Sequence, residues 1–165
     1  MEKKMFCFQC EQTKGCVGCD GNAGVCGKTA ETANLQDKLT GALIGLARAT
    51  DTLEKSLELD KLVMEALFAT LTNVNFNDEE IVALTEKVYD AKKKIAESCN
   101  VCTEPCGKGE DYDMNLLWNA DEDIRSLKSL ILFGVRGVAA YAYHAAVLGY
   151  IDKEHSCNSE ITPIE

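Results

Sequence analysis

Five cysteines lie within the first 26 residues of this 165-residue chain, in a segment that is rich in glycine. They are Cys7, Cys10, Cys16, Cys19 and Cys26. A Cys-x2-Cys pair followed by further cysteines after short spacers is typical of loops that bind an iron–sulfur cluster or a zinc ion, because thiolates are soft ligands. The intervening glycines allow the sharp turns through which such thiolates converge. Spacing alone leaves an iron–sulfur cluster, zinc and unligated thiols open.

The aromatic residues around the first cysteine favour the iron–sulfur alternative. Phe6 and Phe8 flank Cys7, and an apolar shell limits the access of water to a cluster and tunes its reduction potential. The sequence therefore predicts that residues 1–30 form a cysteine-rich loop that binds a metal centre.

A second group of cysteines, with the spacing Cys-x2-Cys-x3-Cys, consists of Cys99, Cys102 and Cys106. A four-ligand site there would also need Cys157, Cys16 or a ligand from outside the chain. We therefore interpret the group as loop thiols, with a zinc or second cluster site as the alternative. His144 and His155 have no cysteine or carboxylate at ligand spacing, so we do not expect them to bind metal.

The overall charge narrows the classes of partner. The formal net charge of -10, from 17 basic and 27 acidic side chains, disfavours nucleic acid and anionic membranes and suits a redox partner with a basic face. No apolar stretch of signal-peptide length precedes the cysteines, so we expect a cytoplasmic location with reduced thiols. The longest apolar run, 130–148, contains Arg136 and His144 and predicts a core helix, not a membrane span.

Apolar residues at helical spacing follow the loop. We expect helices at about 33–53, 61–71, 78–95 and 121–148, the third beginning after an N-cap at Asn77. The acidic runs at 78–80 and 121–123 then complement helix dipoles and need no metal. The predicted fold class is all-α, a helical bundle of residues 31–150 preceded by the cysteine-rich loop 1–30 and followed by a polar tail, 151–165.

Glycine spacing and apolar spacing also predict which helix faces are in contact. Gly41 and Gly45 offer a face on the first helix where another backbone can approach closely, and Gly134 and Gly137 are spaced for close packing of the last helix. On the last helix, the residues expected to face the core are Ile124, Leu127, Ile131, Val135, Val138 and Tyr141 or Ala142.

Four segments resemble one known family. Residues 6–13 (FCFQCEQT) and 24–37 (GVCGKTAETANLQD) closely resemble the start of the hybrid cluster proteins, also called prismane proteins or hydroxylamine reductases, and the resemblance returns at 66–73 and 121–149. It implies that Cys7, Cys10, Cys19 and Cys26 bind a cubane cluster, usually 4Fe-4S, which passes electrons to a hybrid cluster in later domains. Cys16 is then a spare thiol that competes with Cys19 for the third ligand position.

The resemblance also implies that electron transfer and substrate reduction take place in different domains. In the family the ligands of the hybrid cluster lie in downstream domains that have no counterpart in these 165 residues. We therefore expect an electron-transfer unit without catalytic residues of its own, which works with the catalytic domains or a redox partner protein. Apolar surface that would face those domains predicts self-association of the isolated chain. The alternative hypothesis is a zinc-binding structural or interaction module without redox activity.

Overall fold

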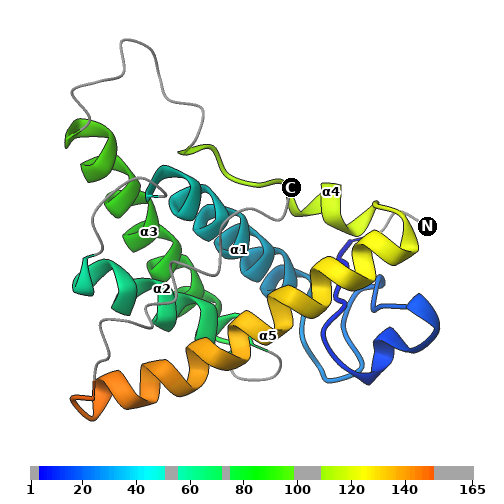
Figure 1. The fold of residues 1–165 in the computed structure, drawn as a ribbon. Coiled ribbons are helices and arrows are strands. Elements are labelled where there is room, and N and C mark those ends of the chain that lie inside the picture. Colours follow the sequence, from blue (N-terminus) through cyan, green and yellow to red (C-terminus); the bar gives the residue numbers. More distant parts are fainter. Residues whose placement is uncertain (1–3, 51–55, 72–74, 99–108, 151–165) are drawn as a thin grey trace.

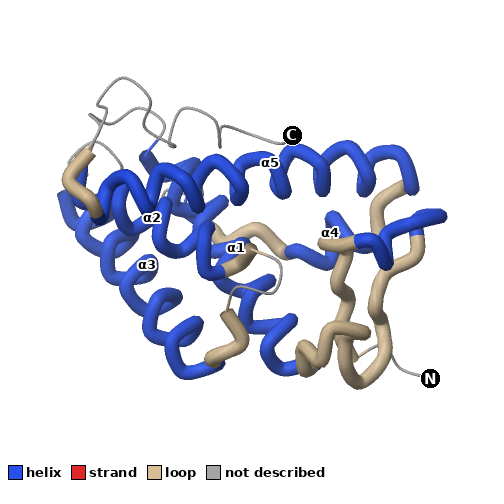
Figure 2. The backbone as a smooth tube through the Cα atoms, turned by 90° about the horizontal axis from the view of Figure 1, so that it is seen from below, coloured by secondary structure: helices blue, strands red, loops and turns tan. Residues whose placement is uncertain are grey.

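The computed structural model describes residues 4–50, 56–71, 75–98 and 109–150, and within these ranges the chain is helical with no named strand (Figures 1 and 2). This confirms the predicted all-α class. The elements, in chain order, are η1 (Glu11–Cys16), α1 (Ala30–Thr50), α2 (Leu57–Ala69), α3 (Asp78–Ser98), α4 (Met114–Trp118) and α5 (Glu122–Val147).

Side-chain caps explain where several helices begin. The Thr29 hydroxyl accepts a hydrogen bond from the Thr32 amide at 3.0 Å, so α1 begins at Ala30, before the predicted start. Asn77 caps α3 as predicted, since its side chain accepts from the amide of Glu80 at 3.3 Å. The short α4 was not predicted. It begins because the Asp113 carboxylate accepts from the Asn115 amide at 2.9 Å.

Two apolar clusters hold the helices together. The larger one lies where α1 packs against α3 and α2 packs against α5, with Leu39, Leu46 and Ile81 almost completely buried (Figure 1). The smaller one lies at the end of the bundle next to the N-terminal loop, and its buried members are Phe8, Met114, Leu117, Trp118 and Leu132. This smaller cluster connects the cysteine-rich loop to α4 and α5.

The predicted buried face of α5 is wrong for most of its residues. Ile124, Leu127, Ile131, Val138 and Tyr141 are between 46% and 84% exposed, whereas the buried residues of this helix are Leu132, Arg136 and Ala139. Val135 and Ala142 pack against the larger cluster while partly exposed. The spacing of apolar residues failed here because the buried stripe contains a charged side chain, which a search for apolar periodicity leaves out.

Helix α5 also has the length and composition of a membrane-spanning helix, with a mean hydropathy of 1.4 over its most apolar window. Core helices of soluble proteins satisfy the same test. The Arg136 side chain projects from α5 into the bundle and donates hydrogen bonds to Thr70 and Thr40, both at 2.9 Å. Two hydroxyl groups inside the protein therefore accept hydrogen bonds from Arg136, the buried charged residue of this helix.

The glycine predictions have opposite outcomes. The backbone at 110–112 lies directly on α1, where the Tyr112 amide donates to the Gly41 carbonyl at 3.0 Å. A Cβ atom added at Gly45 would stand 2.6 Å from the carbonyl oxygen of Glu110. The predicted close approach to α1 is therefore confirmed. Cβ atoms added at Gly134 and Gly137 meet no described atom within 4 Å, so close packing through these two glycines is wrong for the described residues.

Candidate metal centre

Backbone pairing brings two of the predicted ligands together. Cys7 and Cys19 form an isolated antiparallel bridge in which each amide donates to the other's carbonyl, at 2.9 and 3.0 Å. Residues opposite one another in such a pair project their side chains to the same face. A Cβ atom at Gly18 would lie 2.7 Å from the Cys7 carbonyl oxygen, so the close approach of these two segments requires glycine there.

The two remaining predicted ligands, Cys10 and Cys26, lie on turns of the same loop. Cys10 directly precedes η1, and its carbonyl accepts from the Thr13 amide at 2.9 Å. Cys26 is exposed near the tip of a turn that closes with a 3.0 Å hydrogen bond from the Gly27 amide to the Gly24 carbonyl. Gly27 has a φ of 90°, a left-handed conformation that favours glycine.

The environment of Cys7 is electrostatically mixed. Burial raises the pKa of the Cys7 thiol, and the Lys28 ammonium opposes this effect. The negative charges of Asp37, Cys19 and Cys10 raise that pKa further.

Lys28 is the polar residue in closest contact with this thiol. Its side chain is 1% exposed, and its Nζ donates to Gln36 Oε1 at 2.7 Å and to Cys7 Sγ at 3.8 Å. Gln36 is equally buried and donates through Nε2 to the Asn75 carbonyl at 2.9 Å. A buried cation thus points at the sulfur of a predicted ligand and is fixed from behind by an amide.

Further charges lie between the loop and the core. Burial raises the pKa of Asp37 to about 6, against a hydrogen bond that its Oδ2 accepts from Trp118 Nε1 at 2.7 Å. Burial also lowers the pKa of the Arg136 guanidinium to about 10, while the charges of Asp37 and Cys7 favour its cationic form. Sequence reasoning missed Lys28, Asp37 and Arg136, although Lys28 lies within the motif that carries the family resemblance.

The aromatic residues on either side of Cys7 in sequence pack against each other and against α4. Phe6 and Phe8 stack with ring centroids 6.0 Å apart, and Phe6 also contacts Trp118 at 5.3 Å. The Arg125 guanidinium lies over both phenylalanine rings, 5.6 and 5.3 Å from their centroids. The two phenylalanines that flank Cys7 in sequence therefore belong to the smaller apolar cluster and contact α4.

Cys16 lies apart from the Cys7–Cys19 bridge. It adopts a φ of 58°, and its sulfur is 3.4 Å from the Ser126 hydroxyl of α5. Its carbonyl oxygen accepts a hydrogen bond from Arg125 at 3.1 Å. Cys16 therefore joins the loop to the start of α5.

In the part of the chain that the structure describes, no three His, Cys, Asp or Glu side chains are grouped closely enough to hold a metal ion. All five cysteines of the loop are free thiols. The residues Cys99, Cys102, Cys106, Cys157 and His155 lie outside the described residues. His144 is exposed and packs edge-on against Phe68, 5.1 Å between ring centroids.

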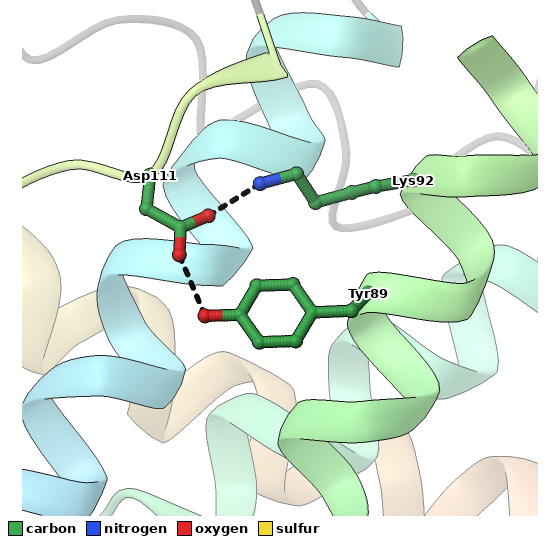
Figure 3. A network of polar contacts seen from close by, with 3 residues as sticks. All are labelled: Tyr89, Lys92 and Asp111. Carbon is green, nitrogen blue, oxygen red and sulfur yellow. Dashed lines mark hydrogen bonds and ion pairs between the residues drawn. The ribbon is translucent and has the colours of Figure 1, made fainter.

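A polar network fastens the segment before α4 to the bundle (Figure 3). The Asp111 carboxylate accepts a 2.7 Å hydrogen bond from the Tyr89 hydroxyl and forms an ion pair with Lys92. Burial, and then the interaction with Asp111, raises the pKa of Tyr89 to about 12. Both partners come from α3, so this network holds the segment from 110 onward against the bundle.

Comparison with known proteins identifies similar sequences over almost the whole chain. Residues 5–160 match the Prismane/CO dehydrogenase family. A hydroxylamine reductase of Porphyromonas gingivalis is 40% identical over 97% of the chain, one of Clostridium novyi is 37% identical over 91%, and one of Thermoanaerobacter pseudethanolicus is 41% identical over 90%. The chain spans only 32%, 31% and 30% of the length of these relatives.

Proposed function

Because the chain belongs to the Prismane/CO dehydrogenase family, we propose that its N-terminal loop holds a 4Fe-4S cluster and that this part of the protein transfers electrons. The proposed ligands are Cys7, Cys10, Cys19 and Cys26. The observation that carries the proposal is the pairing of Cys7 with Cys19 beside a buried lysine directed at Cys7. Free thiols with a cation behind them suit a centre whose ligands are thiolates.

The residues around the loop fit such a centre. The rings of Phe6, Phe8 and Trp118 pack together beside the backbone that carries Cys7 and place apolar surface at this end of the loop. Lys28 and Arg136 supply positive charge, which offsets the negative charge of several thiolates. A cluster bound there would accept and release single electrons, and the protein would determine its potential and its orientation toward a partner.

The whole relatives are named hydroxylamine reductases, and the chain spans about one third of their length. We propose that reduction of hydroxylamine needs polypeptide corresponding to the other two thirds, and that these 165 residues alone are not catalytic. The exposed apolar residues of α5 are the proposed docking face for that polypeptide: Ile124, Leu127, Leu130, Ile131, Val138 and Tyr141. Without it, we expect the isolated chain to self-associate through this face.

The proposed setting is the cytoplasm, where free thiols persist. All five cysteines of the loop are free. The net charge of -10 argues against nucleic acid and an anionic membrane as partners.

Metal analysis tests the proposed cluster. The chain is purified without oxygen, and iron, sulfide and zinc are measured per polypeptide together with the EPR spectrum after reduction by dithionite. We expect about four irons and four sulfides and the signal of one reduced cubane. Cys19→Ala should lose most of the iron, whereas the matched variant Cys16→Ala should keep it, because Cys16 contacts Ser126 and lies apart from the bridge.

Three outcomes would each contradict a part of this proposal. Zinc in place of iron after anaerobic purification would indicate a structural zinc module, in which the metal stabilises the fold. If Cys16→Ala lost its iron while Cys19→Ala retained it, Cys16 and not Cys19 would be the third ligand. Hydroxylamine turnover by the isolated chain with a chemical reductant would overturn the claim that it is not catalytic by itself.

A further inference from the structure

Lys28 is an unusual residue to find almost completely buried. A lysine ammonium loses much hydration energy on burial, and proteins normally compensate by pairing it with a carboxylate. At Lys28 the contacting groups are the Gln36 amide at 2.7 Å, the Cys7 sulfur at 3.8 Å and the Phe76 ring, whose centroid is 5.8 Å away. Among the described residues, no carboxylate oxygen lies within ion-pair distance of this ammonium.

Among these direct contacts of the Lys28 ammonium, the group that can carry a negative charge is the sulfur of Cys7. Resting on the proposed function, we propose that Lys28 sets the reduction potential of the centre bound through Cys7, as a charged hydrogen-bond donor to that ligand. It is a positioning residue for electron transfer and contacts no substrate.

The physical reason is the change of charge on reduction. An electron from a one-electron donor makes a thiolate-ligated centre more negative by one charge, and no bond has to form or break at the protein. A cation that donates to one ligand sulfur stabilises the reduced form more than the oxidised form and raises the potential. Because Lys28 is shielded from water, solvent screens this effect little.

The neighbours of Lys28 keep its charge in place. Gln36 accepts from the ammonium and is itself held through its bond to the Asn75 carbonyl. The Lys28 carbonyl accepts from the Gly24 amide at 2.7 Å, which closes the turn that carries Cys26. One residue thus joins the Cys26 turn through its backbone to Cys7 through its side chain.

The experiment compares the midpoint potential of three variants with that of the wild type, by dithionite titration followed by EPR. Lys28→Met removes the charge with similar length and little loss of packing, Lys28→Arg keeps the charge, and Lys94→Met removes an exposed lysine near the end of α3, away from the loop (Figure 1). At the wild-type midpoint we expect the ratio of reduced to oxidised centre to fall about tenfold in Lys28→Met, a lowering of about 59 mV for one electron. Lys94→Met should leave it unchanged.

Each result decides between the alternatives. An iron-loaded Lys28→Met chain with the wild-type potential would overturn this inference and leave the proposed function standing. If Lys28→Met is folded by circular dichroism but loses iron, a near-normal potential in Lys28→Arg would support the role of charge. Loss of iron in both variants would assign Lys28 to packing and refute the inference. A wild-type chain without iron would overturn the proposed function and, with it, this inference.

Discussion

The close contact between α1 and the segment before α4 predicts that glycine-to-alanine substitutions at two helix positions change the thermal stability in opposite directions. An alanine Cβ at Gly45 would stand 2.6 Å from the Glu110 carbonyl oxygen and 2.9 Å from the Lys92 ammonium. Lysine can move away, but the backbone carbonyl cannot do so without displacing its segment. Since carbon–oxygen contacts of this kind are normally about 3.3 Å or longer, the segment must shift by roughly 0.7 Å.

The effect of Gly45→Ala on the free energy of unfolding is the sum of a gain in helix propensity and a cost of overpacking. Replacing a glycine inside a helix by alanine stabilises the helix by about 1 kcal/mol. At Gly45 the overpacking costs about 1–3 kcal/mol, and displacement of Lys92 from Asp111 costs up to about 1 kcal/mol more. Together these terms lower the free energy of unfolding of Gly45→Ala by between about 0 and 3 kcal/mol, with about 1.5 kcal/mol at the centre of the range. For a chain of this size, a loss of about 1.5 kcal/mol lowers Tm by roughly 3–6 °C.

Gly134→Ala is the matched control, because it adds the same methyl group in the middle of α5, where no described atom lies within 4 Å. It should raise Tm by about 2–4 °C, through helix propensity alone. Both variants and the wild type are unfolded thermally, without oxygen, and followed by circular dichroism at 222 nm. Equal shifts in the two variants, or a higher Tm for Gly45→Ala than for Gly134→Ala, would refute the close approach of 110–112 to α1.

Three further predictions concern charge and exposed surface. Because the pKa of Asp37 rises from 3.8 to about 6 on folding, the folded chain retains a proton that the unfolded chain has lost; its stability in urea should fall by up to about 3 kcal/mol between pH 4 and 6. Asp37→Asn should remove this contribution, and an unaltered pH profile would contradict it. Arg136→Met should cost less stability in urea than Arg136→Ala, since methionine fills the buried space without a charge and alanine leaves a cavity; equal costs would show that the cavity closes. Leu127→Lys should reduce self-association in sedimentation velocity with little change in Tm, because Leu127 is 63% exposed; unchanged association would place the contact elsewhere.

Apolar spacing predicted the helices of this chain better than it predicted their faces. The stripe of α3 emerged directly from the sequence because Ile81, Leu84 and Val88 are apolar residues on one buried face. On α5, apolar residues surround most of the helix, so periodicity could not distinguish a face that packs inside the bundle from one that remains exposed. The glycines show the same limit: a Cβ atom added at Gly45 meets a backbone carbonyl, whereas one added at Gly134 meets no described atom within 4 Å, although both are helix glycines.

The cysteines of the site could be predicted because ligand type and spacing are local properties. The pairing of Cys7 with Cys19 follows from two backbone hydrogen bonds between segments twelve positions apart in sequence, which residue spacing does not specify. The charges near Cys7 come from Lys28 of the loop, Asp37 of α1 and Arg136 of α5, and only the folded chain brings all three together. The sequence pattern could therefore predict which cysteines are ligands, but not the charged groups that surround them in the folded chain.

The sequence of α1 nevertheless contained an indication of where buried polar contacts would form. Thr32, Gln36 and Thr40 recur every four residues and form a buried polar stripe beside the apolar one, each between 1% and 2% exposed. Each contacts a different part of the chain: Thr32 donates to Asp78 of α3 at 2.6 Å, Gln36 accepts from Lys28 of the loop, and Thr40 accepts from Arg136 of α5. Buried polar side chains are costly unless their partners are fixed. A polar stripe on a core helix is therefore best explained by the charges that the site requires, and it shows where along α1 the loop and α5 must meet.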